Sequence, residues 1–148
     1  MITRETIYST IFTLWGSIPG IVTLSRRLYH WSDVPQEMQP ALYQIQRNER
    51  TIQKRGLPTV WELSLDLYVY TNVGNDQNAV PAIALNPILD AISTILAPDP
   101  FSGYQTLDGL VSHAWIDGLI ETSEGALGPQ EVAVVPMKIL TAGAGKYD

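Results

Sequence analysis

Apolar residues recur at helical spacing near the start of the chain. Five of them share the i, i+4, i+7, i+8, i+11 positions of one helix face: Ile7, Ile11, Leu14, Trp15 and Ile18. Thr3 can cap this helix, and Glu5 lies near its positive end. Gly16 and Pro19-Gly20 then break the pattern. The sequence therefore predicts a first helix that packs one stripe against a core.

The clearest strand signal is the alternation in VWELSLDLYVYT, Val60 to Thr71. One face carries Leu63, Leu65, Leu67 and Val69, and the other carries Glu62, Ser64, Asp66, Tyr68 and Tyr70. Such alternation places one face on a core and the other toward water or a partner. A shorter strand is expected at Ala41–Gln46, and the charged arm Arg47–Thr59 lies between the two. The pair predicts an antiparallel hairpin with a projecting loop.

A second helix and two more strands are expected in the second half of the chain. Asn86-Pro87 is a good helix start, and one apolar face follows it: Ile88, Ile92, Ile95 and Leu96. Alternating segments predict strands at Val111–Glu121 and Val132–Thr141. Because Pro136 cannot donate a ladder hydrogen bond, we expect the last strand to lie at an edge or to carry a bulge there.

The predicted order is α-β-β-α-β-β, an α+β sandwich. A four-stranded, mainly antiparallel sheet would carry both helices on one face. Ile21–Trp31 stays open between a short strand and irregular structure, and Pro35 and Pro40 mark a connector. The sequence predicts one domain over residues 1–141 and a flexible tail over 142–148.

Composition fits one ordinary domain, because 148 residues with 45% hydrophobic residues can bury a substantial core. The chain has no cysteine, which excludes disulfides, zinc-thiolate sites and a cysteine nucleophile. The N-terminus lacks the pattern of a signal peptide, and apolar runs are too short for a membrane span. We expect no membrane association.

Motifs for catalysis or cofactor binding are missing from the sequence. His30 and His113 have no metal-ligand spacing, and the adjacent Ser112 and His113 would point to opposite strand faces. Glu62 and Asp66 share a strand face, but a solvated or intersubunit face explains them better than an acid/base pair. The tail TAGAGKY lacks the spacing and following helix of a phosphate loop. We therefore expect no enzyme, metal or cofactor.

Charge is unevenly distributed along the chain, whose net charge is −6. Residues 1–56 hold seven Arg/Lys and four Asp/Glu, whereas residues 57–148 hold two Lys and eleven Asp/Glu. The two parts carry +3 and −9. Complementary parts of this kind suit docking between unlike surfaces, although a scattered solvated surface is equally compatible. A free DNA-binding protein would normally carry a basic surplus.

Arginine and aromatic residues cluster in RRLYHW, Arg26 to Trp31. Arg26, Arg27, Tyr29 and Trp31 could stack on and neutralise nucleic acid. The same residue types are the most enriched at protein interfaces. In an acidic chain the interface is the better interpretation, and we expect Ala at Arg27 and Trp31 to weaken assembly without unfolding the subunit.

Taken in order, several segments resemble the tail terminator, or tail completion, proteins of long-tailed bacteriophages. They are HWSDVPQEMQPALYQIQ, the charged arm, GLPTVWELSLDLYVYT, ALNPILDAISTIL and EVAVVPMKIL. The resemblance extends from about Thr3 to Thr141. No single motif is diagnostic, but their order and spacing together are distinctive.

The resemblance implies a structural virion protein that forms a ring, most simply a homohexamer. Such a ring is assembled in the host cytoplasm, caps the tail tube, ends tube growth and presents a surface to the head-tail connector protein. It sits at the head-proximal end of the tail, and the genome DNA passes through its lumen.

Three sets of residues are candidates for contacts in such a ring. Candidates for subunit or partner contact are Arg26, Arg27, Tyr29, Trp31, Arg50, Lys54 and Arg55. The arm Arg47–Thr59 and the loop Thr122–Gln130 are candidates for reaching the tube or the connector. Glu62, Ser64 and Asp66 are candidates for a lumen wall that repels DNA phosphates.

Two other functions stay open. The chain could be a head-closure or neck protein of similar symmetry, which would bind the portal side. It could also be a small enzyme or ligand-binding domain with a pocket at Tyr68 and Tyr70, but the missing catalytic motifs make this the weakest of the alternatives.

Overall fold

The computed structural model describes residues 2–124 and 127–142. It contains the helices α1 (Arg4–Trp15) and α2 (Pro81–Ile95). Six strands form a single mixed sheet: β1 (Thr23–Ser25), β2 (Ala41–Ile52), β3 (Val60–Asn72), β4 (His113–Ile116), β5 (Glu121–Thr122) and β6 (Gln130–Ala142). The predicted α+β class is confirmed. The expected flexible tail at 142–148 lies, apart from Ala142, outside the described residues.

The prediction of a four-stranded sheet in the order α-β-β-α-β-β is wrong in detail. The strands follow the order β1-β2-β3-β6-β4, and β5 also pairs with β6. β1 is an additional strand within the segment left open by the sequence, and it pairs with β2 in parallel. The strand expected at Val111–Glu121 is divided into β4 and β5, because the chain leaves the sheet around Gly118, which has a φ of 93°.

β6 is an interior strand, so the prediction of an edge strand is wrong. It pairs with β3 along its whole length without a register shift, and with β4 and β5 on its other side. The proline is tolerated because of where its nitrogen faces. The Pro136 carbonyl accepts from the Asp117 amide at 2.9 Å, so its nitrogen faces the same side, where the chain runs between β4 and β5. The irregularity lies in the neighbouring strands.

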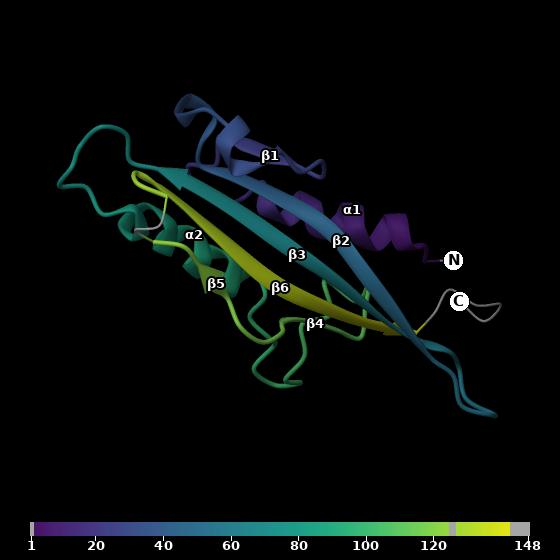
Figure 1. The fold of residues 1–148 in the computed structure, drawn as a ribbon. Coiled ribbons are helices and arrows are strands. Elements are labelled where there is room, and N and C mark those ends of the chain that lie inside the picture. Colours follow the sequence, from purple (N-terminus) through teal and green to yellow (C-terminus); the bar gives the residue numbers. More distant parts are fainter. Residues whose placement is uncertain (1, 125–126, 143–148) are drawn as a thin grey trace.

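β2 and β3 form the expected antiparallel hairpin, but its strands are longer than predicted. β2 continues to Ile52 through most of the arm that the sequence suggested was a loop. A bulge between Gln46 and Glu49 adds one residue to β2. Beyond the bulge the hairpin extends past the helices as a narrow exposed ribbon (Figure 1). Its connecting residues, 53–59, form the tip.

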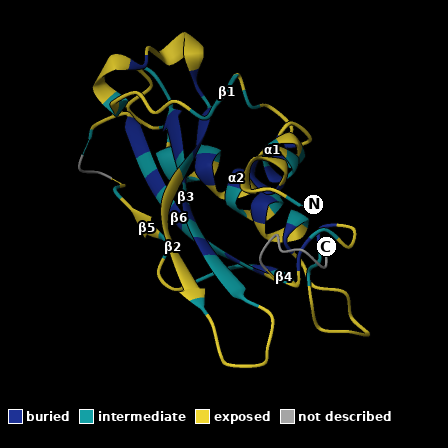
Figure 2. Ribbon diagram, turned by 90° about the vertical axis from the view of Figure 1, so that its right-hand side faces the viewer, coloured by how far each residue is buried: buried dark blue, intermediate teal, exposed yellow. Residues whose placement is uncertain are grey.

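Both helices cover one face of the sheet, as predicted (Figure 2). The odd-numbered β3 positions Leu63, Leu65, Leu67 and Val69 are buried beneath them. From α1 come Ile7, Ile11 and Trp15, and from α2 come Leu85, Ile88 and Ile92. This interface forms the larger hydrophobic core.

A buried glutamine joins α1 to the sheet. The Gln44 side chain accepts from the indole nitrogen of Trp15 at 2.9 Å and donates to the carbonyl of Tyr8 at 3.0 Å. Gln44 is 1% exposed, so these partners satisfy polar groups that water cannot reach. The contact fixes where α1 lies across β2.

The opposite face, here called the open face, is covered by side-chain packing only near one end. There Val34, Ala41, Tyr43 and Tyr70 form a second, small core beneath the segment 26–40. This segment includes two short 3₁₀ turns, η1 (Trp31–Asp33) and η2 (Gln36–Met38). The remainder of the open face carries partly exposed side chains.

α2 begins six residues earlier than predicted, at Pro81 in place of Pro87. Pro81 takes the first helical position, where a missing amide donor costs nothing, and Pro87 falls inside the helix. The predicted apolar face is nevertheless confirmed, because Ile88, Ile92 and Leu96 are buried. Among the described residues, no helix has the length and apolar character needed to cross a membrane.

Candidate functional site

The Arg26–Trp31 cluster lies at one end of the sheet, where it packs over β2 and β3 of its own subunit. The Tyr70 hydroxyl donates to the Tyr29 carbonyl at 2.8 Å. Burial raises the pKa of Tyr70 to about 12, so this phenol keeps its proton for the bond. The Tyr29 ring meets Tyr43 edge-on, at 6.3 Å between ring centroids. The tyrosine is therefore held by the sheet while 47% of it stays exposed.

Trp31 is partly buried and has an intramolecular role as well. Its ring packs against the small core of the open face, and its carbonyl accepts from the Gln130 side chain at 3.1 Å. An alanine at position 31 would remove packing from this subunit in addition to any contact with a partner.

The two arginines of the cluster differ. Arg26 bonds to Glu5 of α1 and to Gln46 of β2, so it ties the chain after β1 to the helix side. Arg27 is exposed, and its guanidinium lies 5.8 Å from the Tyr29 ring centroid. Of the two, Arg27 is the one available for a partner.

The other predicted contact residues lie at the far end of the hairpin. Arg50 is near the end of β2, and Lys54 and Arg55 are at the tip. All three are exposed and none makes a salt bridge within residues 2–124 and 127–142. The same segment contains Arg47 and Glu49, whose charges are paired with Asp66 and Arg4. Its other charged side chains are all positive, and we therefore call residues 47–59 the basic arm.

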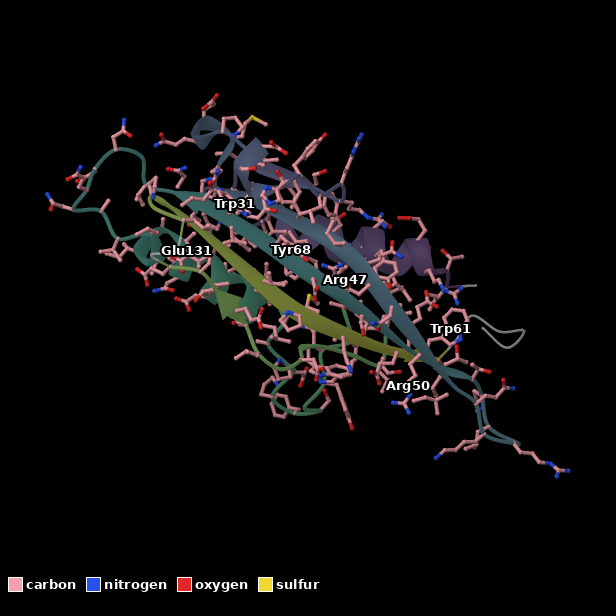
Figure 3. All side chains as sticks on the ribbon, viewed as in Figure 1. Trp31, Arg47, Arg50, Trp61, Tyr68 and Glu131 are labelled. Carbon is pink, nitrogen blue, oxygen red and sulfur yellow. The ribbon has the colours of Figure 1, made fainter. Side chains whose placement is uncertain are left out.

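The seven predicted contact residues therefore form two groups, not one patch. β3 runs between the groups for 13 residues, which at the rise of a β-strand is about 40 Å. Figure 3 shows Trp31 near one end of the molecule and Arg50 near the other. Any partner that contacts both groups at once must be long, or must be two molecules.

Glu62, Ser64 and Asp66 lie together on the open face, as the strand alternation predicted. Both carboxylates are paired: Glu62 with Lys138 at 2.8 Å, and Asp66 with Arg47 at 2.7 Å. The Glu62 carboxylate raises the pKa of Lys138, and the Asp66 carboxylate likewise raises the pKa of Arg47. Neutralisation by these cations makes the face much less acidic than the strand alone suggested.

A hollow of about 280 Å³ lies on this part of the open face, lined by Arg47, Ser64, Asp66, Asp117, Pro136 and Lys138. Lys138 also contacts Asp117 at 3.4 Å, and Asp117 accepts from the indole nitrogen of Trp115 at 3.2 Å. The face is thus a network of internal ion pairs, and Arg47 also bonds to Tyr68. It offers a partner balanced charges beside aromatic rings.

A group of acidic residues that the sequence did not predict lies at the end of the sheet opposite the basic arm. We call Asp33, Glu37, Asp76, Glu121 and Glu124 the acidic end. All five are exposed, and none makes a salt bridge within the described parts of the chain.

Contacts between three loops bring the segments that carry these acids to the same end of the sheet. The Gln36 side chain lies against Gly74, the Val73 amide donates to the Pro129 carbonyl at 3.0 Å, and Gln130 bonds to Trp31. No local pattern could have found the group, because its members come from segments far apart in sequence.

A shallow hollow of about 340 Å³ opens at the acidic end. Its apolar lining comes from Trp31, Leu127, Val132 and Val134, and Glu121 contributes a carboxylate. The sequence predicted Trp31 as a contact residue and included Leu127 in the candidate loop Thr122–Gln130, but gave no sign of Val132 and Val134 at the start of β6.

Glu131 is a second feature that the sequence did not predict. It lies on the helix side of β6, opposite Thr71 of β3, and is 2% exposed. One of its carboxyl oxygens and the Thr71 hydroxyl are buried and have no hydrogen-bond partner among the described residues. Burial, and secondly the nearby charge of Glu124, raise the pKa of Glu131.

The two histidines lie apart, His30 just before η1 and His113 at the start of β4, and both make local hydrogen bonds. His30 bonds to Ser32 through Nδ1 at 2.7 Å, and Nδ1 of His113 accepts from the Gln105 amide at 3.0 Å. Within the described residues, no three His, Asp or Glu side chains gather closely enough to hold a metal ion.

Comparison with known proteins adds no relative: no protein-family model matches the chain, and no curated protein matches it significantly.

Proposed function

We propose that this protein is a structural component of a bacteriophage virion that forms a ring, caps the tail tube and joins the tail to the head. It would act without catalysis, cofactor or membrane. Its partners would be copies of itself, most simply six, together with the tail tube protein and the head-tail connector protein. It would assemble in the host cytoplasm and remain at the head-proximal end of the tail.

One observation carries the proposal: the subunit has two unlike ends about 40 Å apart, a basic arm that projects from the sheet and an acidic end. A closed ring needs heterologous contacts, in which one patch meets a different patch on the neighbour. An elongated subunit with unlike ends suits such contacts. The sequence resemblance to tail terminators supports the same role.

The open face is the candidate surface for the ring lumen or for the tube. Glu62, Ser64 and Asp66 would lie there, but their pairing with Lys138 and Arg47 would give DNA a nearly neutral wall. Such a wall would neither hold the genome nor repel it strongly, which suits passage without sequence-specific binding.

The direct test is electron microscopy of purified protein mixed with tail tubes from the phage that encodes it. We expect rings at one end of each tube, and no further growth when tube protein is added. Particles made without the protein should carry tails of abnormal length that fail to join heads. Tails of normal length joined to heads would end the proposal.

The same preparation distinguishes the alternative of a head-closure or neck protein. Such a protein should decorate isolated portal complexes and leave tube ends bare. The alternative of a pocket at Tyr68 and Tyr70 gains nothing from the fold, because Tyr70 is buried and its hydroxyl already bonds to Tyr29.

A further inference from the structure

The tip of the basic arm carries an exposed apolar side chain between its charges and the returning strand. Leu57 is 60% exposed, and Lys54 and Arg55 precede it. A turn closed by the Leu57 amide bonding to the Lys54 carbonyl at 3.0 Å sets its position. Gly56 has a φ of 81°, which a residue with a side chain rarely adopts. The tip is therefore a projecting turn in which two cations precede an exposed leucine.

The acidic end has the complementary form. Its hollow of about 340 Å³ is lined by Trp31, Leu127, Val132 and Val134, and Glu121 lies at the same hollow. Glu124 follows β5 along the chain and is exposed. An apolar hollow with carboxylates beside it matches a leucine with cations beside it, both in polarity and in the sign of charge.

The two surfaces cannot meet within one subunit. The tip follows Ile52 of β2, whereas the hollow lies where β6 begins, and the length of β3 separates them. A projection and a hollow on different parts of the same molecule produce a head-to-tail contact, which closes into a ring when the rotation between copies allows it.

We propose that the tip of the basic arm of one copy seats in the hollow of the acidic end of the next copy. Leu57 would fill the apolar hollow beside Trp31, and Lys54 and Arg55 would pair with Glu121 and Glu124. The occupant of the hollow is thus a second copy of this chain. This inference rests on the proposed ring and names the contact that would build it.

Cysteine cross-linking tests the contact directly, because the chain has no cysteine of its own. Lys54→Cys and Glu121→Cys are combined in one chain, which is then treated with a short bismaleimide, both free and on tail tubes. We expect a ladder of covalent oligomers that ends at the ring number. Lys54→Cys alone, the matched control, should stay monomeric. Dimers from that single variant would indicate arm-to-arm contact and overturn the inference.

Charge reversal provides a second, independent test. Lys54→Glu with Arg55→Glu, and separately Glu121→Lys with Glu124→Lys, should each weaken self-association or tube capping about tenfold or more. An equimolar mixture of the two variants should recover assembly, because each reversed arm then meets a reversed end. Asp90→Lys, an exposed reversal on α2 away from both surfaces, should have little effect. Variants that do not complement each other in the mixture would contradict the contact.

The outcomes separate this inference from the proposed function. Normal capping of tubes without a ladder, free or on tubes, would refute the contact and leave the cap role standing. A ladder of cross-linked oligomers from a protein that does not bind tube ends would establish the contact and refute the cap role. A tube protein that cross-links through the hollow in place of a second copy would also refute the inference.

Discussion

Buried polar residues show most clearly where the sequence stops being informative. Gln44 and Glu131 occupy strand positions whose side chains face the helices, and both are buried. Alternation assigns a face to each position, but it cannot show which partners will approach that face. Gln44 finds two partners from α1, whereas one oxygen of Glu131 finds none among the described residues.

Glu131 makes stability depend on pH. Because its pKa is raised in the folded state, folding favours the protonated carboxyl, and this contribution is complete only below the unfolded value of 4.5. It is lost as the pH rises through the folded pKa. We expect Glu131→Gln to be more stable than the parent protein at pH 7, with the difference shrinking toward pH 4.5.

Urea unfolding across that pH range measures the effect. Glu37→Gln, an exposed acid in η2, is the matched control and should follow the parent curve. A Glu131→Gln variant with the parent's pH dependence would show that the buried carboxyl does not govern it.

Helices and strands were predicted well where a periodic pattern extends over many residues. Their ends were predicted poorly where a proline or a glycine sets them. β3, α1 and the apolar face of α2 follow from repeated spacing. The start of α2 does not, because Pro81 and Pro87 are both acceptable first residues, and the tertiary fold chose the earlier one. The division of β4 from β5 depends on a glycine whose positive φ the sequence only permits.

The proline inside α2 predicts a stabilising substitution. Pro87 lacks the amide that would bond to the Ile83 carbonyl, and its side chain is exposed, so little packing depends on it. We expect Pro87→Ala to raise the free energy of unfolding by about 1–3 kcal/mol, measured by urea titration. Pro81→Ala, at the first helical position, should give no such gain. Equal effects of the two substitutions would argue against this explanation.

At the scale of the whole molecule, the uneven charge of the two halves of the sequence does not correspond to the two ends of the fold. The sequence halves carry +3 and −9, yet Asp33 and Glu37 of the basic half lie at the acidic end. Folding returns the segment 26–40 to the start of β6, far from the arm that it precedes in sequence. Counting charges along the sequence cannot show that the chain folds back in this way.

Charge at the two ends predicts a salt-sensitive assembly. Exposed charges beyond a Debye length of about 10 Å at 0.1 M salt are largely screened, and short-range surface pairs also weaken. We expect self-association, followed by sedimentation velocity, to weaken as NaCl rises from low concentration, while urea unfolding of the subunit changes little. Association that strengthens with salt would indicate a contact dominated by apolar burial.

Pro136 also limits how the sheet can assemble. Its nitrogen has no hydrogen to donate to a neighbouring strand. The nitrogen faces the side of β4 and β5, where the Asp117 amide makes the last hydrogen bond before the chain leaves the sheet. Slippage of β4 by two residues toward the proline would leave a carbonyl of the incoming strand without a donor. The missing amide hydrogen of Pro136 therefore favours one register of β4 against β6 over the neighbouring registers.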